Sequence, residues 1–147
     1  TLHTNSAVGA VARLRDMGIE PFLLASSLIG VLAQRLVRVL DPRLREAYAA
    51  TIQDLTAFGL PEDLLPLELY RPRQDGLRGA GYRGRTGIYE LVAVDESIRA
   101  LIHESVSEAV LEARARERGP SILLDGFDKV RQGITSIDEI LRVTRDD

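Results

Sequence analysis

The chain has 147 residues, of which 45% are hydrophobic, enough to bury the core of an ordinary domain. Charged residues make up 28% and the formal net charge is -3, which argues against a protein whose whole surface binds a polyanion. There is no cysteine, which excludes disulfides and thiolate metal sites, and no apolar run approaches the roughly 20 residues that span a bilayer.

The first 40 residues predict two helices and a segment of ambiguous type. Asn5 or Ser6 supplies the N-cap of a first helix, which Gly18 ends. A second helix begins near Pro21, because a proline loses nothing at the first helical position. Residues 31–40 suit either the continuation of a long helix or, being rich in β-branched side chains, a buried strand.

The middle of the chain predicts one helix, a loop-rich stretch and a strand. Residues 60–84 contain three prolines and four glycines, which is typical of turns and loops. Residues 86–94 form a nearly continuous apolar run, as expected of a buried strand. Residues 44–58 have the periodicity of an amphipathic helix, whose apolar face would consist of Leu44, Tyr48, Ile52 and Leu55.

The remainder of the chain predicts four helices, the third of which ends at Gly133. Two of them begin with the Ser-x-x-Glu spacing of a capping box, and each such cap contributes about 0.5–2 kcal/mol. The start signals, in order, are Asp95, the pair Ser105 and Glu108, Pro120, and the pair Ser136 and Glu139.

The sequence contains no complete set of catalytic residues. A phosphate loop of the GxxxxGK[ST] kind is absent, so the chain cannot assemble a nucleotide site alone. His103 lies inside a helical pattern and is interpreted as an ordinary helix residue. His3 lies where a predicted strand end meets a capped helix, the place where open α/β sheets bind ligands. By position alone, an ordinary strand-end histidine remains the simpler interpretation.

Residues 70–85 form a basic segment that carries glycines and aromatic side chains. One interpretation is an RNA-binding Arg/Gly segment that stacks bases and neutralises phosphates. The other is a solvated loop or a surface that meets an acidic neighbour, which its modest length and the neutral-to-acidic remainder of the chain favour. Its members are Tyr70, Arg71, Arg73, Arg78, Tyr82, Arg83 and Arg85.

Several stretches resemble the secretion ATPase superfamily. Residues 1–7, Thr-Leu-His-Thr-Asn-Ser-Ala, resemble its histidine box, and residues 17–22 and 33–38 resemble the segments that follow. Residues 81–91, Gly-Tyr-Arg-Gly-Arg-Thr-Gly-Ile-Tyr-Glu-Leu, are similar to its late motif. Its C-terminal end is matched by Asp125-Gly126, Lys129-Val130, Gly133-Ile134-Thr135-Ser136 and Leu141-Arg142-Val143-Thr144. The resemblance is weakest across residues 41–80 and is closer to type II secretion ATPases than to type IV pilus assembly ATPases.

The resemblance implies an α/β fold: the C-terminal portion of a RecA-like ATPase domain followed by a helical C-terminal region. Residues 1–40 would be the second half of the core, 41–80 an insert that matches the family's zinc-loop subdomain, and 81–147 a core strand with C-terminal helices. Residues 31–39 are then a strand. Because the chain opens at Thr1 and not at methionine, we expect it to be a piece of a longer protein.

The resemblance also assigns site residues. His3 takes the place of the box histidine beside the γ-phosphate of ATP, and is the candidate catalytic residue. Arg83 and Arg85 are candidates for a subunit interface or for a contact with phosphate. In the family the Walker A loop and the Walker B acid precede the histidine box, so this chain alone should be catalytically inactive.

One departure from the family concerns its zinc loop, which carries two Cys-x-x-Cys pairs. The matching positions here are Asp41 and Leu44, then Gln74 and Leu77. Leucine cannot ligate a metal, and tetrahedral zinc needs four ligands. We therefore predict no zinc, and we expect an apolar contact of Leu44 with Leu77 to replace the metal.

The implied function is that of a motor part, which powers pseudopilus assembly and protein export in type II secretion. The full-length protein would use ATP and Mg²⁺ and form a homo-hexamer. It would be cytoplasmic and peripheral at the inner membrane, bound to inner-membrane secretion components, without nucleic acid and without a transmembrane segment. The alternatives are part of a type IV pilus assembly ATPase, and a non-enzymatic partner- or RNA-binding module that uses residues 70–85.

Overall fold

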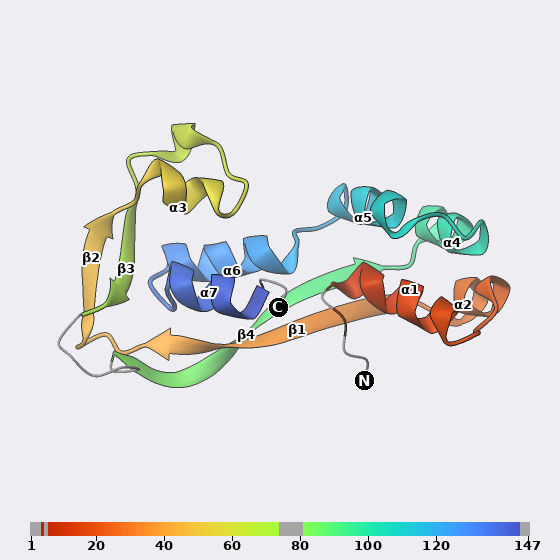
Figure 1. The fold of residues 1–147 in the computed structure, drawn as a ribbon, viewed down its shortest axis with the longest axis horizontal. Helices are drawn as coiled ribbons and strands as arrows, with labels where there is room; N and C mark the ends of the chain where they lie inside the picture. Colours follow the sequence, from red (N-terminus) through yellow and green to blue (C-terminus); the bar gives the residue numbers. More distant parts are fainter. Residues whose placement is uncertain (1–3, 5, 74–80, 145–147) are drawn as a thin grey trace. The chain divides into compact units, whose positions relative to one another are not determined.

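A computed structural model describes residues 4, 6–73 and 81–144. They form two compact units, the first built from residues 1–34 and 89–122 and the second from 35–88 and 123–147. The elements are α1 (Ala7–Asp16), α2 (Pro21–Ser27), β1 (Gly30–Leu40), β2 (Arg45–Ala49), α3 (Ile52–Thr56), the 3₁₀ turn η1 (Glu62–Leu64), β3 (Glu68–Pro72), β4 (Tyr82–Ala93), α4 (Glu96–His103), α5 (Glu108–Arg116), α6 (Ile122–Arg131) and α7 (Ile137–Thr144) (Figure 1).

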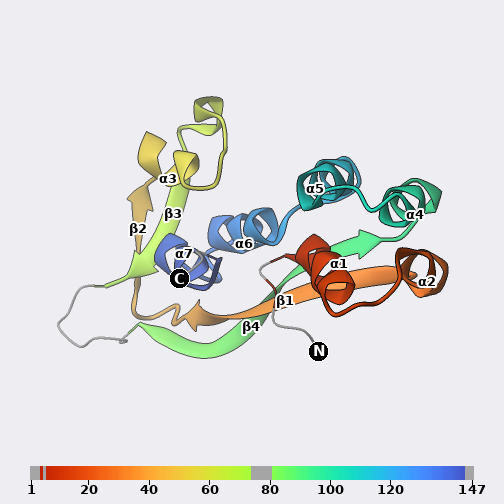
Figure 2. The same ribbon diagram turned by 45° about the vertical axis from the view of Figure 1, so that its right-hand side comes forward.

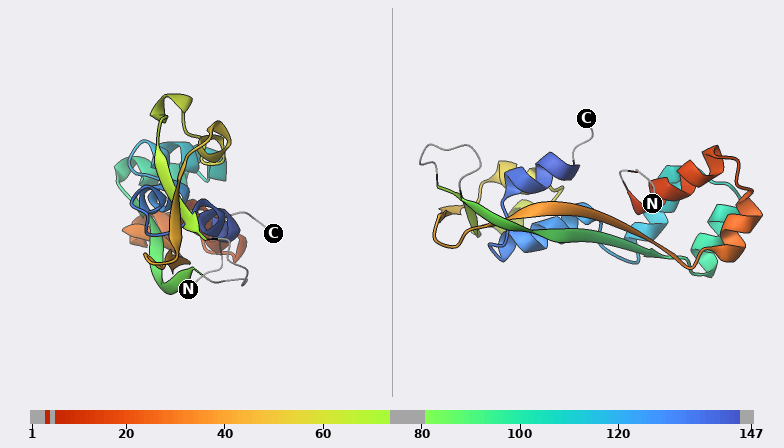
Figure 3. Two further views of the ribbon diagram at one scale, coloured as in Figure 1. Left: turned by 90° about the vertical axis from the view of Figure 1, so that its left-hand side faces the viewer. Right: turned by 90° about the horizontal axis from the view of Figure 1, so that it is seen from below.

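Strands β1 and β4 pair with each other and contribute residues to both units (Figure 3). The pairing is antiparallel, because the amide of Val94 donates to the carbonyl of Ile29 at one end (3.0 Å) and that of Asp41 to the carbonyl of Gly81 at the other (2.8 Å). The strand expected over residues 31–39 is thus confirmed. The strand expected over 86–94 is also present, and it begins earlier, at Tyr82.

The first unit packs its helices in pairs, α1 with α5 and α2 with α4 (Figure 2). The predicted starts are confirmed: the Ser6 hydroxyl accepts from the amide of Gly9 (2.9 Å), Pro21 opens α2, and the Asp95 carboxylate accepts from the amide of Ile98 (2.9 Å). Gly18 follows α1 with a φ of +86°. The buried side chains of this unit include Val8, Val11, Leu24, Ile98, Ile102 and Leu111.

The second unit combines the β2–β3 hairpin, α3, η1 and the helices α6 and α7. The two hairpin strands pair antiparallel, with Tyr48 opposite Leu69. The rings of Phe58 and Phe127 meet at a centroid distance of 5.0 Å, which anchors the end of α3 to α6. Its buried side chains include Val37, Leu40, Leu55, Leu69, Ile88, Val130 and Ile140.

The helix expected over residues 44–58 is wrong. The structure forms the strand β2, then a short helix that begins after Thr51, whose hydroxyl and the Asp54 carboxylate form a reciprocal capping box. Two residues of the supposed apolar face, Leu44 and Ile52, are 38% and 49% exposed. The loop-rich stretch that follows includes η1 and the strand β3, which pairs with β2.

One of the two predicted capping boxes is misplaced. Ser105 has a φ of +56° beyond the end of α4, and the N-cap of α5 is Ser107. Of the capping box predicted at Ser136, one half is present: the Ser136 hydroxyl accepts from the amide of Glu139 (3.3 Å). The Glu139 side chain, however, accepts from Arg38 and Arg142. In the described ranges, no helix is long and apolar enough to cross a membrane.

Candidate functional site

The proposed catalytic residue, His3, lies outside the residues that the structure describes. Its neighbours Thr4 and Ser6 are described, and they lead directly into α1. The Thr4 hydroxyl donates to the carbonyl of Ser6 (3.0 Å), whose own hydroxyl caps the helix. The histidine box therefore continues into a helix N-terminus, where backbone N–H groups favour negative charge.

Arg83 and Arg85 lie two residues apart on β4, and both side chains are exposed. Gly84, between them, has a φ of +78°, so the regular alternation of side chains along an extended strand is interrupted at this point. Neither arginine forms a salt bridge with another of the described residues. Their assignment to an interface or to phosphate stays a prediction.

The aromatic residues of the basic segment are already engaged within the second unit. The guanidinium of Arg45 covers the ring of Tyr70 (4.2 Å to the centroid), and that of Arg38 covers Tyr82 (4.3 Å). Arg71 pairs with Glu46 across the hairpin, at 2.7 Å between Nε and Oε1. For the part of the segment that the structure describes, these contacts favour a structural role over the stacking of bases. Arg78 lies outside the described residues.

The positions that match the zinc loop do not fit a zinc ion. Asp41 uses its carboxylate to accept from the backbone N–H, Nε and Nη2 of Arg43, and these hydrogen bonds lower the pKa of Asp41. Leu44 has no ligand atom, and Gln74 and Leu77 lie outside the described residues, as does any contact between the two leucines. In the described ranges no group of three or more possible metal ligands occurs. The absence of zinc stays a prediction.

Residues 133–136, which match the C-terminal end of the family, connect the strands of the second unit to α7. The carbonyl of Gly133 accepts from Nη1 of Arg45 (2.5 Å), and the carbonyl of Ile134 accepts from the amide of Leu40 (2.8 Å). The Thr135 hydroxyl donates to the carbonyl of Arg38 (2.8 Å). The motif therefore holds β1 and β2 against the turn between α6 and α7.

Glu139 is the centre of a charge cluster in the same unit, in which the carboxylate is buried and both arginines are partly exposed. Its side chain is fully buried and accepts from the backbone N–H of Arg38 (2.9 Å) and from Nη2 of Arg38 and of Arg142 (both 2.7 Å). Burial alone raises the pKa of Glu139, but the hydrogen bonds from Arg142 and Arg38 outweigh it and lower the pKa to about 2. Sequence reasoning missed this role because capping-box spacing suggested a local partner.

A buried carboxylate also occurs in the first unit, where it belongs to Glu90 on β4. It is 2% exposed, pairs with Nη2 of Arg116 on α5 (2.5 Å), and accepts from the amide of Ile122 (3.4 Å). The signal was visible in the sequence, because a single charge inside a nearly continuous apolar strand needs a partner.

We expect Glu90→Ala to lower the free energy of unfolding by about 2–3 kcal/mol, because it leaves the amide of Ile122 and the guanidinium of Arg116 without this acceptor. Urea denaturation followed by circular dichroism measures the loss. The matched control is Glu117→Ala, which removes the same charge from an exposed pair with Arg114 and should cost less than about 1 kcal/mol. Equal losses for the two variants would contradict the assignment.

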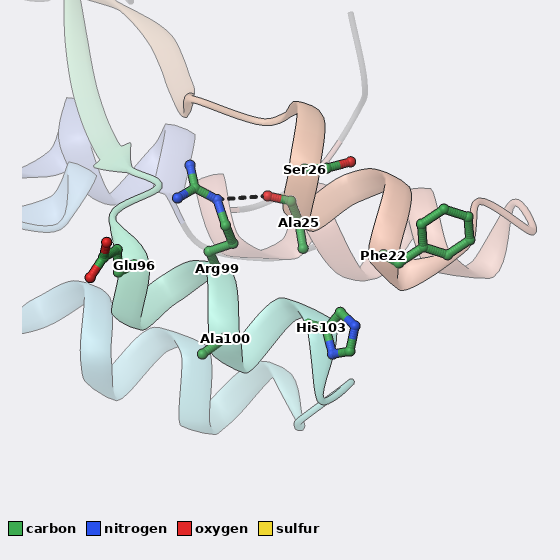
Figure 4. A pocket seen from close by; sticks show the side chains of 7 residues that line it. All are labelled: Phe22, Ala25, Ser26, Glu96, Arg99, Ala100 and His103. Atoms are coloured by element: carbon green, nitrogen blue, oxygen red, sulfur yellow. Dashed lines mark hydrogen bonds between the residues drawn. The ribbon is translucent and has the colours of Figure 1, made fainter.

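A groove of about 470 Å³ lies between α2 and α4 in the first unit (Figure 4). Arg99 donates from Nε to the carbonyl of Ala25 (2.8 Å), which holds its guanidinium at the groove. His103, which the sequence placed inside a helix, is exposed on α4 and lines the groove. The lining residues are Phe22, Ala25, Ser26, Glu96, Arg99, Ala100 and His103.

Comparisons with known proteins identify the family. The model of the family described as type II/IV secretion system protein matches residues 1–142. The type II secretion system protein E of Pseudomonas aeruginosa is 54% identical over 148 residues, and the type II secretion system ATPase E of Vibrio cholerae is 54% identical over 147. These alignments cover 100% and 99% of this chain and 29% of each relative.

A third relative, the putative type II secretion system protein E of Escherichia coli, is 43% identical over 143 residues, which are 97% of this chain and 29% of the relative. The chain thus spans about 29% of the length of the curated relatives it matches. All three carry the type II name that the resemblance indicated. By the match over residues 1–142, this chain belongs to the type II/IV secretion system protein family.

Proposed function

We propose that this chain is part of the ATP-hydrolysing motor that powers type II secretion. The observation that carries the proposal is the family match over residues 1–142, together with a 54% identical relative that is named an ATPase. The mixed α/β architecture, with β1 and β4 paired and helices packed on both units, is compatible with the C-terminal portion of a RecA-like domain.

In this proposal the chain supplies one face of a composite site. His3 lies beside the γ-phosphate, while the groups that hold the phosphates and Mg²⁺ come from sequence outside these residues, since no phosphate loop occurs here. Phosphoryl transfer depends on positioning and electrostatics, so one histidine without those groups gives no turnover. The chain alone should neither bind nor hydrolyse ATP.

The wider assembly rests on the family resemblance. The whole protein would form a homo-hexamer at the cytoplasmic face of the inner membrane, bound to inner-membrane secretion components. Nucleotide state would move its domains as rigid bodies and drive pseudopilus growth. Head-to-tail contacts between copies are the kind that close into rings.

A chimera tests the proposal. The matching segment of the Vibrio cholerae ATPase is replaced by this chain, and ATP hydrolysis and protein export are measured in a strain that lacks the native gene. We expect the chimera to support both, and His3→Ala within it to lower hydrolysis by about 100-fold. A folded but inactive chimera, or ATP turnover by the purified 147-residue chain, would contradict the proposal.

A further inference from the structure

The groove between α2 and α4 has the features of a docking site for an apolar side chain flanked by acids. Ala25 and Ala100 are small, and Phe22, which also lines the groove, is 55% exposed. Nε of Arg99 donates to the carbonyl of Ala25, and its two Nη groups have no hydrogen-bond partner among the described residues. His103 lies at one end of the groove and Glu96 at the other, two helical turns or about 10 Å away.

The second unit carries a surface of complementary character, which we call the acidic lobe and define as residues 50–70. It contains no basic residue and four acidic ones, Asp54, Glu62, Asp63 and Glu68. At its 3₁₀ turn, Glu62 and Asp63 directly precede Leu64, all three are exposed, and Leu64 is 42% exposed. Leu55 and Phe58 of the same lobe are buried, and Phe58 packs against Phe127, which holds the lobe against the rest of the second unit.

We propose that the acidic lobe of one copy of this chain binds the α2–α4 groove of a second copy. Leu64 would lie over Ala100, while Glu62 and Asp63 face the Nη groups of Arg99 and the ring of His103. The charges match, since the lobe offers carboxylates and no cation, and this end of the groove offers donors. The contact joins two different surfaces, so it can repeat from copy to copy into a ring or a filament.

The expected strength of this contact decides how it must be measured. One 3₁₀ turn in one groove buries far less than the roughly 1,200 Å² of a stable interface. The contact alone should therefore be weak, and a covalent trap is the suitable readout. The proposal does not depend on ATP hydrolysis, so its failure leaves the motor function untouched.

Disulfide trapping provides the test, because the chain has no cysteine of its own. The double variant Leu64→Cys with Ala100→Cys is oxidised, and the products are separated on a non-reducing gel. We expect a dimer and a ladder of larger species. The control pairs Leu64→Cys with Val110→Cys, which is 46% exposed on α5 outside the groove, and should cross-link at least several-fold more slowly.

Charge reversal adds a second readout in the trapping variant. Asp63→Lys should slow cross-linking by about fivefold, as expected for an exposed ion pair, and His103→Glu introduced with it should restore the rate. Three results would overturn the proposal. They are a disulfide formed only within one chain, cross-linking of the control at the same rate, and a cross-linking rate that changes with neither charge substitution.

Discussion

Replacing Glu139 with alanine should lower the free energy of unfolding by about 3 kcal/mol, one of the two largest effects of a single substitution that we expect in this chain. The fully buried carboxylate is the acceptor for the Arg38 backbone N–H and for the guanidinium groups of Arg38 and Arg142. Without it, the strand β1 and the helix α7 lose their charged link, and the Arg38 N–H loses its acceptor.

Urea denaturation of the wild type, Glu139→Ala and Glu139→Gln measures this effect. Glutamine keeps the shape and one acceptor oxygen but not the charge, so its loss should be smaller than that of alanine. Asp138→Asn is the matched control, because it removes a charge from the adjacent, exposed position and should change stability by less than about 0.5 kcal/mol. A Glu139→Ala loss below about 1 kcal/mol would contradict the charge cluster.

The same cluster predicts a pH dependence. The pKa of Glu139 falls from an ordinary value of 4.5 to about 2, so the folded state favours the ionised form. This contribution, about 3 kcal/mol for such a shift, is complete above pH 4.5 and disappears as the pH falls through 2. The stability difference between the wild type and Glu139→Gln should therefore be constant from pH 7 to 5 and shrink progressively from pH 4.5 towards 2. A constant difference down to pH 2 would show that the carboxylate is not stabilised by its partners.

The features that could be predicted from sequence are those that depend on near neighbours. Ser6 and Asp95 cap their helices, and Pro21 opens α2, because each signal acts within three residues of its own backbone. The family motifs also identified residues 31–39 as a strand, which periodicity alone left open. A capping-box pattern is less decisive: Ser105 has the spacing, but the chain leaves α4 there with a positive φ.

The features that sequence reasoning missed depend on distant partners. The residues of β2 have the spacing of an amphipathic helix, but Glu68–Pro72 pairs with them from some 20 residues away, and pairing overrides periodicity. Glu139 looked like a local cap, and its main partner, Arg38, is 101 residues away in the chain. The groove on α2 and α4 likewise joins side chains from the two separate chain segments that make up the first unit, so neither segment alone reveals it.

Gly133→Ala should lower the free energy of unfolding by about 3 kcal/mol, and it tests the C-terminal motif 133–136 at its tightest point. Gly133 has a φ of +67°, where an L side chain costs about 1–2 kcal/mol. A Cβ there would also lie 2.6 Å from Nη1 of Arg45 and 2.8 Å from Cδ2 of Tyr70. Relieving this overlap displaces the Arg45 guanidinium from the Tyr70 ring and from the Gly133 carbonyl, which adds a packing cost of about 1–3 kcal/mol.

Gly59→Ala separates the two contributions. Gly59 has nearly the same φ, +66°, but a Cβ there would meet nothing within 4 Å, so only the backbone cost applies. The excess loss of Gly133→Ala over Gly59→Ala therefore measures the overlap with Arg45 and Tyr70. In an Arg45→Ala background that excess should fall by at least 1 kcal/mol, because the nearest displaced atom is gone. If Gly133→Ala costs no more than Gly59→Ala, the motif glycine is required for its backbone conformation alone; if it costs the same with and without Arg45, the overlap with Arg45 contributes nothing.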